Sequence, residues 1–142
     1  METLKRIIGV VLIVIAAIVA LQTVLEPIYH TSTADSPHSS TWDYINPLSL
    51  ISIILGVIFG YIRMRRAGAD ASVQEFIAAN TLFYGFMFVA IIFLWNWFGI
   101  SGVGQDFTGV DHGTRSLVWI LFDATLPLLN GAMGVHLLRS SG

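Results

Sequence analysis

Cysteine is absent from this 142-residue sequence. Its absence excludes disulfide bonds, thiol redox chemistry, iron–sulfur clusters and zinc sites built from thiolates. Charged residues are also scarce, at 11% of the chain, whereas a soluble domain carries about a quarter. The net charge is −2 and no basic patch or tail is present, so we do not expect nucleic acid as a partner.

Hydrophobic residues make up 55% of the sequence and gather in four long runs. We expect each run to be a transmembrane helix, because a helix of about 20 residues crosses a hydrocarbon core about 30 Å thick. A helix also satisfies its own backbone polar groups in lipid. The predicted fold is all-α, with residues 1–142 forming a single domain that is an antiparallel four-helix transmembrane bundle. The predicted spans are 7–25, 45–62, 76–98 and 116–138.

The basic residues predict the direction of these spans. If the spans alternate, six basic residues fall on one side of the membrane and Arg115 falls on the other. Because cytoplasmic loops carry an excess of Lys and Arg, we expect both termini in the cytoplasm and two loops outside the plasma (inner) membrane. The first span also resembles a signal peptide, and we expect it to be retained as an anchor. The six residues are Lys5, Arg6, Arg63, Arg65, Arg66 and Arg139.

Local signals predict several helix ends. Asn46 followed by Pro47 suits a helix N-terminus, with Asn as the N-cap and Pro in the first helical position. Ser72 and Glu75 have the spacing of a capping box immediately before the third span. Gly99, with the glycine-rich stretch that follows it, is expected to end that span.

The fourth span contains residues that are unusual in a membrane helix. Asp123, Pro127 and Asn130 share one helical face. A polar face of this kind normally packs against other helices rather than lipid. Pro127 adds to its polarity, because proline cannot donate a backbone hydrogen bond to the carbonyl of Asp123. Two small residues complete the face, Gly131 and Gly134.

The partners of this face can be predicted from depth in the membrane. In an antiparallel pair with the third span, Asn130 is expected to lie level with Tyr84 and to form a hydrogen bond with it. Asp123 is expected to lie level with Ser52 on the second span. Three arrangements of Asp123 stay open. Its carboxyl group is protonated and bonded within the chain, or it faces a hydrated cavity on an ion or proton path, or its partner comes from another protein chain.

Small and basic residues mark two further features. Gly56 and Gly60 form a GxxxG motif on the second span, which permits close helix approach either within the bundle or to a partner protein. The basic cluster that follows is expected to set the topology and to contact anionic lipid headgroups. It consists of Arg63, Arg65 and Arg66.

Histidine and aspartate residues in the outer loops are candidate metal ligands. Imidazole and carboxylate groups could bind copper, zinc or iron there, although no two histidines have helical spacing. A haem held by two histidines would need a pair at similar depth on facing helices, and His136 stands alone. No cofactor is indicated by the sequence. The candidate metal ligands are His30, His38, Asp111 and His112.

The sequence contains no recognisable catalytic motif, so we do not expect the chain to be an enzyme by itself. We expect a non-catalytic accessory subunit of a larger membrane complex, such as an oxidase, a monooxygenase or another energy-transducing assembly. Its partners would be the lipid bilayer and other membrane subunits. One alternative is a small self-assembling transporter or channel with Asp123 in the path. The other is a membrane metal-binding protein or enzyme that uses His and Asp residues of the outer loops.

Overall fold

The computed structural model describes residues 2–33, 35–68, 71–100 and 112–140, and the regular secondary structure in these ranges is helical. Each helix is long and apolar enough to cross a membrane. The prediction of an all-helical chain with four helices of membrane-spanning length is therefore confirmed. The helices are α1 (Glu2–Tyr29), α2 (Trp42–Arg66), α3 (Val73–Ile100) and α4 (His112–Arg139).

The helices extend beyond the predicted spans at both ends. α2 begins at Trp42, so the prediction that Asn46 caps this helix and Pro47 opens it is wrong. Trp42 and Ile45 are buried in one apolar cluster with Ile15 and Val19 of α1. This packing favours helix ahead of the proline, where the backbone N–H groups of Asp43, Tyr44 and Ile45 donate to the carbonyl groups of Ser40 and Thr41. α3 is described to Ile100, one residue past Gly99, and the glycine-rich stretch that was also expected to end this span lies outside the described residues.

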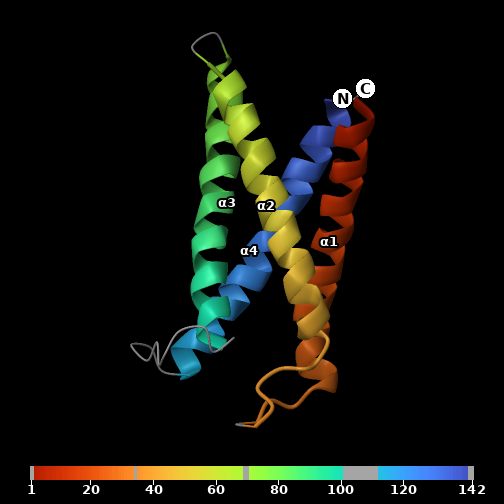
Figure 1. The fold of residues 1–142 in the computed structure, drawn as a ribbon, viewed down its shortest axis with the longest axis vertical. Coiled ribbons are helices and arrows are strands. Elements are labelled where there is room, and N and C mark those ends of the chain that lie inside the picture. Colours follow the sequence, from red (N-terminus) through yellow and green to blue (C-terminus); the bar gives the residue numbers. More distant parts are fainter. Residues whose placement is uncertain (1, 34, 69–70, 101–111, 141–142) are drawn as a thin grey trace.

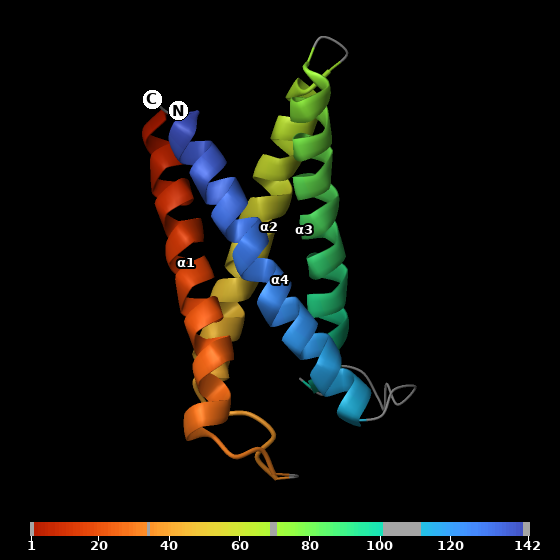
Figure 2. The same cartoon turned by 180° about the vertical axis from the view of Figure 1, so that it is seen from behind.

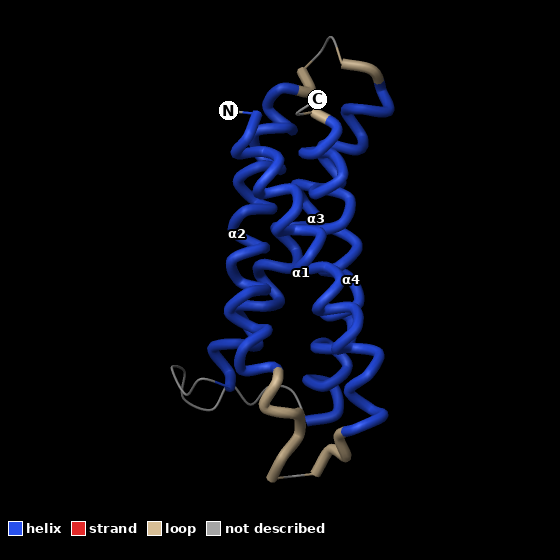
Figure 3. The backbone as a smooth tube through the Cα atoms, turned by 90° about the vertical axis from the view of Figure 1, so that its right-hand side faces the viewer, coloured by secondary structure: helices blue, strands red, loops and turns tan. Residues whose placement is uncertain are grey.

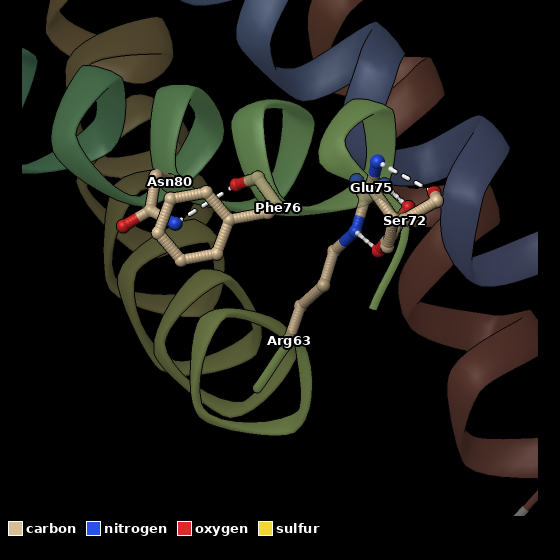
Figure 4. A network of polar contacts seen from close by, with 5 residues as sticks. All are labelled: Arg63, Ser72, Glu75, Phe76 and Asn80. Atoms are coloured by element: carbon tan, nitrogen blue, oxygen red, sulfur yellow. Dashed lines mark hydrogen bonds and ion pairs between the residues drawn. The ribbon is translucent and has the colours of Figure 1, made fainter. Parts of the chain in front are cut away.

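The start of α3 is held by the predicted cap and by an ion pair. The backbone N–H of Glu75 donates to Ser72 Oγ at 3.2 Å, which confirms one half of the capping box. The carboxylate of Glu75 does not complete the box. It accepts two hydrogen bonds of 2.7 Å from Nε and Nη2 of Arg63 (Figure 4). This bidentate pair ties the last turn of α2 to the first turn of α3.

The four helices form two pairs that cross. Successive helices run in opposite directions, and both chain termini lie at the end that also holds the α2–α3 connection (Figures 1 and 2). α1 packs mainly on α4 and α2 mainly on α3, whereas α1 and α3 make no contact over the described residues. α2 and α4 cross near mid-length, and in the side view the described loops lie at the two ends (Figure 3).

Glycine permits the close approach within each pair. The ring of Phe86 on α3 lies directly over Gly56, in the space that a Cβ atom would need. A Cβ at Gly60 would lie 3.2 Å from the Cα of Phe83. The GxxxG motif is thus used inside the chain, against α3.

A second glycine contact joins the other pair of helices. A Cβ at Gly134 of α4 would lie 2.7 Å from the carbonyl oxygen of Gly9 of α1. The predicted small-residue face of α4 thus includes a real helix contact at Gly134. The contact at Gly9 was not predicted, because one glycine in an apolar run carries no signal of its own.

Replacement of Gly56 by leucine is expected to destabilise the α2–α3 pair, because the new side chain must displace the ring of Phe86. Overpacking of this kind costs about 1–3 kcal/mol. The midpoint of thermal unfolding in detergent, followed by tryptophan fluorescence, should fall relative to the unsubstituted protein. Gly131→Ala is the control, because a Cβ there would meet nothing within 4 Å. An unchanged midpoint in Gly56→Leu would contradict the close packing described here.

Candidate functional site

A group of buried polar side chains lies in the membrane-spanning part of the molecule. Three come from one face of α2, one from α3 and two from α4. Polar residues inside membrane helices are uncommon and usually face the bundle interior, as these do. We call this group the buried polar cluster; its members are Asn46, Ser49, Ser52, Asn96, Asp123 and Asn130.

One hydrogen bond of the cluster joins the two crossing helices. Nδ2 of Asn130 on α4 donates to Oγ of Ser52 on α2 at 2.9 Å. The hydroxyl of Ser52 donates in turn to the backbone carbonyl of Ser49, also at 2.9 Å. Asn130 and Ser52 are each 0% exposed. In lipid such a bond stabilises helix association, since no water competes for its partners.

The predicted hydrogen bond between Asn130 and Tyr84 is wrong, because Asn130 donates to Ser52 and Tyr84 is 62% exposed. The predicted depth of Asn130 relative to α3 was nevertheless close to the depth in the structure. A Cβ at Gly85 would lie 2.8 Å from Cδ2 of Leu129 on α4. The error is in the rotation of α3. The ring of Phe86 packs over α2, and this orientation leaves the face that carries Tyr84 exposed.

Asp123 is buried within its own chain, at 8% exposed. Its Oδ1 atom has no hydrogen-bond partner in the part of the chain that the structure describes. The prediction that Ser52 lies level with Asp123 is wrong. Ser52 bonds to Asn130, seven residues further along α4, or about 10 Å at 1.5 Å per residue. α4 continues as a helix through Pro127, which leaves the carbonyl of Asp123 without its usual donor.

Four other buried oxygen atoms of the cluster resemble Oδ1 of Asp123. Each lacks a hydrogen-bond partner among the described residues. A buried polar atom without a partner costs about 1–3 kcal/mol, so proteins keep such atoms where water, an ion or a proton uses them. Carboxyl, amide and hydroxyl oxygens are acceptors of the kind that hard cations and protons prefer. The four atoms are Asn46 Oδ1, Ser49 Oγ, Asn96 Oδ1 and Asn130 Oδ1.

The polar residues of the connection between α1 and α2 hold this loop together instead of meeting at one place. The carboxylate of Glu26 accepts hydrogen bonds of 2.7 Å from both the backbone N–H and the hydroxyl of Ser39. Nε2 of His30 lies 3.1 Å from the carbonyl oxygen of Ser36, and Nδ1 of His38 lies 3.3 Å from that of Ser39. Over the described ranges, no three potential metal ligands gather at one place.

Two of the predicted metal ligands are not tested by the structure. Asp111 and the side chain of His112 lie outside the described residues. The metal-site prediction stays a prediction at these two positions.

The basic cluster at the end of α2 divides into two parts. Arg63 is bound to Glu75 and its side chain is 12% exposed. Arg65 and Arg66 are exposed. His136 does not belong to the buried polar cluster. It is half-buried and lines a cavity together with Arg63.

The bond between Asn130 and Ser52 can be measured with a double-mutant cycle. We expect a coupling of about 0.6–1.7 kcal/mol, the range found for hydrogen bonds between membrane helices. Ser52→Ala, Asn130→Leu and the double variant should be compared by reversible unfolding in mixed micelles. Tyr84→Phe combined with Asn130→Leu is the matched control, and its coupling should be near zero. Coupling to Tyr84 rather than to Ser52 would contradict the rotation of α3.

No protein family, no curated protein and no solved structure matches this chain. We therefore infer function from the buried polar cluster and from the charges at the ends of the helices.

Proposed function

We propose that this chain is a small membrane transporter or channel that moves protons or a small cation, with Asp123 in the path. The observation that carries the proposal is the position of Asp123. Its carboxyl group is buried in its own bundle, and one of its oxygen atoms lacks a partner in the described residues. Burying a carboxyl group in the membrane costs free energy. The carboxyl groups that membrane helices retain commonly mark proton or ion paths.

The rest of the buried polar cluster extends the path along α2, α3 and α4. Asn46 lies near the start of α2 and Asn96 near the end of α3, and these helix ends lie at the end of the bundle away from the termini (Figure 1). Ser52 and Asn130 join α2 to α4. Oxygen atoms spaced along one interior can pass a proton through water or bind a cation in steps.

The chain would sit in the plasma (inner) membrane with both termini in the cytoplasm. Six of its seven Lys and Arg residues lie at the end of the bundle that holds both termini, and Arg115 lies at the other end. The positive-inside rule places the end richer in Lys and Arg in the cytoplasm. In this orientation the half of α4 that carries Asp123 lies nearer the outside.

Asp123→Asn should abolish transport, because the amide keeps the shape of the side chain but cannot release a proton or carry a charge. The purified protein would be reconstituted in liposomes with an internal pH dye and a potassium diffusion potential. We expect the flux to fall at least about tenfold, to the level of protein-free liposomes, if Asp123 is essential to the path.

Asp43→Asn is the matched control for this experiment. Asp43 is an exposed carboxylate near the start of α2, outside the buried polar cluster, and its replacement should leave the flux unchanged. Two results would reject transport through Asp123. One is wild-type protein with no flux above protein-free liposomes for protons, sodium or potassium, and the other is equal flux in wild-type and Asp123→Asn.

A second candidate function is the accessory subunit of a larger membrane complex. Gly131 favours it, because a Cβ at this position would meet nothing within 4 Å. The neighbouring side chain of Leu128 is exposed. Gly131 is thus a small residue in a membrane helix that the chain itself does not use, and a partner helix can approach closely there. Gly56, in contrast, already packs within the chain.

Gly131→Leu should therefore disturb a complex while it leaves the chain folded. The protein would be isolated from its native membrane in mild detergent, and the polypeptides that accompany it would be identified and weighed. We expect partners at fixed stoichiometry with the unsubstituted protein and at least about tenfold less of them with Gly131→Leu, as for loss of a well-packed contact. Isolation of this chain alone, or partners unaffected by the substitution, would reject the subunit function.

A further inference from the structure

A cavity of about 450 Å³ lies where α2 and α4 end. Its polar lining consists of Arg63, Thr81, His136 and Arg139, and its apolar walls include Leu82 and Val135. Arg63 lies in the last turn of α2, and His136 and Arg139 lie in the last turn of α4. The cavity therefore opens at the level where a membrane helix meets the headgroups.

The mouth of the cavity carries net positive charge. Nε and Nη2 of Arg63 are bound to Glu75, so this arginine is neutralised in part and held in place. Its Nη1 group makes no hydrogen bond within the described residues and keeps its two N–H donors. Arg139 adds a full positive charge, and the imidazole of His136 adds a further hydrogen-bonding group. The cavity thus offers a positioned donor, an exposed cation and a ring nitrogen to an anion.

Beneath the charged mouth the walls become apolar. Leu82 is buried and lies about 14 Å along α3 from Val73, the first residue of that helix. Val135 forms the facing wall on α4. A charged mouth above an apolar interior is complementary to an amphiphile, with its anionic group at the surface and its hydrocarbon within the bilayer.

We propose that this cavity binds one anionic phospholipid, with the phosphate group held by Arg63, His136 and Arg139 and an acyl chain along Leu82 and Val135. The site differs from the basic cluster predicted from the sequence, because it excludes the exposed Arg65 and Arg66 and includes two residues of α4. The bound lipid would connect α2 and α3 to the end of α4. The site does not depend on transport or on a partner subunit.

Lipid binding can be measured by native mass spectrometry of the full chain in mixed micelles. Phosphatidylglycerol and phosphatidylcholine would be titrated separately. We expect one phosphatidylglycerol per chain, retained at least about fivefold more tightly than phosphatidylcholine, since one basic group near a lipid surface contributes about this factor. The double variant His136→Gln/Arg139→Gln should lose this preference. Arg65→Gln/Arg66→Gln removes two positive charges outside the cavity and should keep it.

Each alternative result overturns a definite part of the proposal. Equal retention of the two lipids would exclude recognition of the anionic group. Loss of the preference in Arg65→Gln/Arg66→Gln to the same extent as in the cavity variant would show attraction to the whole basic end. Displacement of phosphatidylglycerol by inorganic phosphate alone would identify a site for a free anion. The thermal midpoint of each variant, measured in the same micelles, separates a lost site from a lost fold.

Discussion

The hydrogen bond from Asn130 to Ser52 lies where the two halves of the molecule meet. One half is the α1–α4 pair and the other is the α2–α3 pair, and α2 crosses α4 between them. In lipid no hydrophobic force draws helices together. A buried polar contact of this kind therefore contributes strongly to which helix faces pack against each other. Along α4, Asp123 lies before this crossing, and His136 and Arg139 of the basic cavity lie after it.

Shape complementarity within each pair sets the rotation of the helices about this crossing. Phe86 fills the space above Gly56, and Gly134 allows its helix to approach Gly9. Once the ring of Phe86 faces α2, the geometry of a helix decides which of its other faces meet lipid. Tyr84 is exposed as a result. The contacts that fold the chain therefore also decide which polar residues belong to the interior and which do not.

The two proposed sites lie on opposite sides of the crossing and differ in charge. One site offers a carboxyl group and amide and hydroxyl oxygens, which are ligands for a proton or a cation. The other site offers arginine and histidine, which suit an anionic headgroup. The pattern agrees with the proposed cytoplasmic orientation of the termini, because the positive-inside rule places basic residues at the cytoplasmic surface. A lipid bound in the basic cavity would stabilise the angle between the two pairs.

The sequence by itself determined that four apolar helices form, because length and hydropathy are local properties of each run. It also determined that Asp123 and Asn130 share a face, since helical periodicity needs no partner. Only the tertiary structure decided that Ser52, rather than Tyr84, bonds to Asn130, and that His136 and Arg63 line one cavity. Relative depth and rotation depend on contacts such as Phe86 over Gly56, which join residues far apart in the chain and leave no periodic signal in either helix.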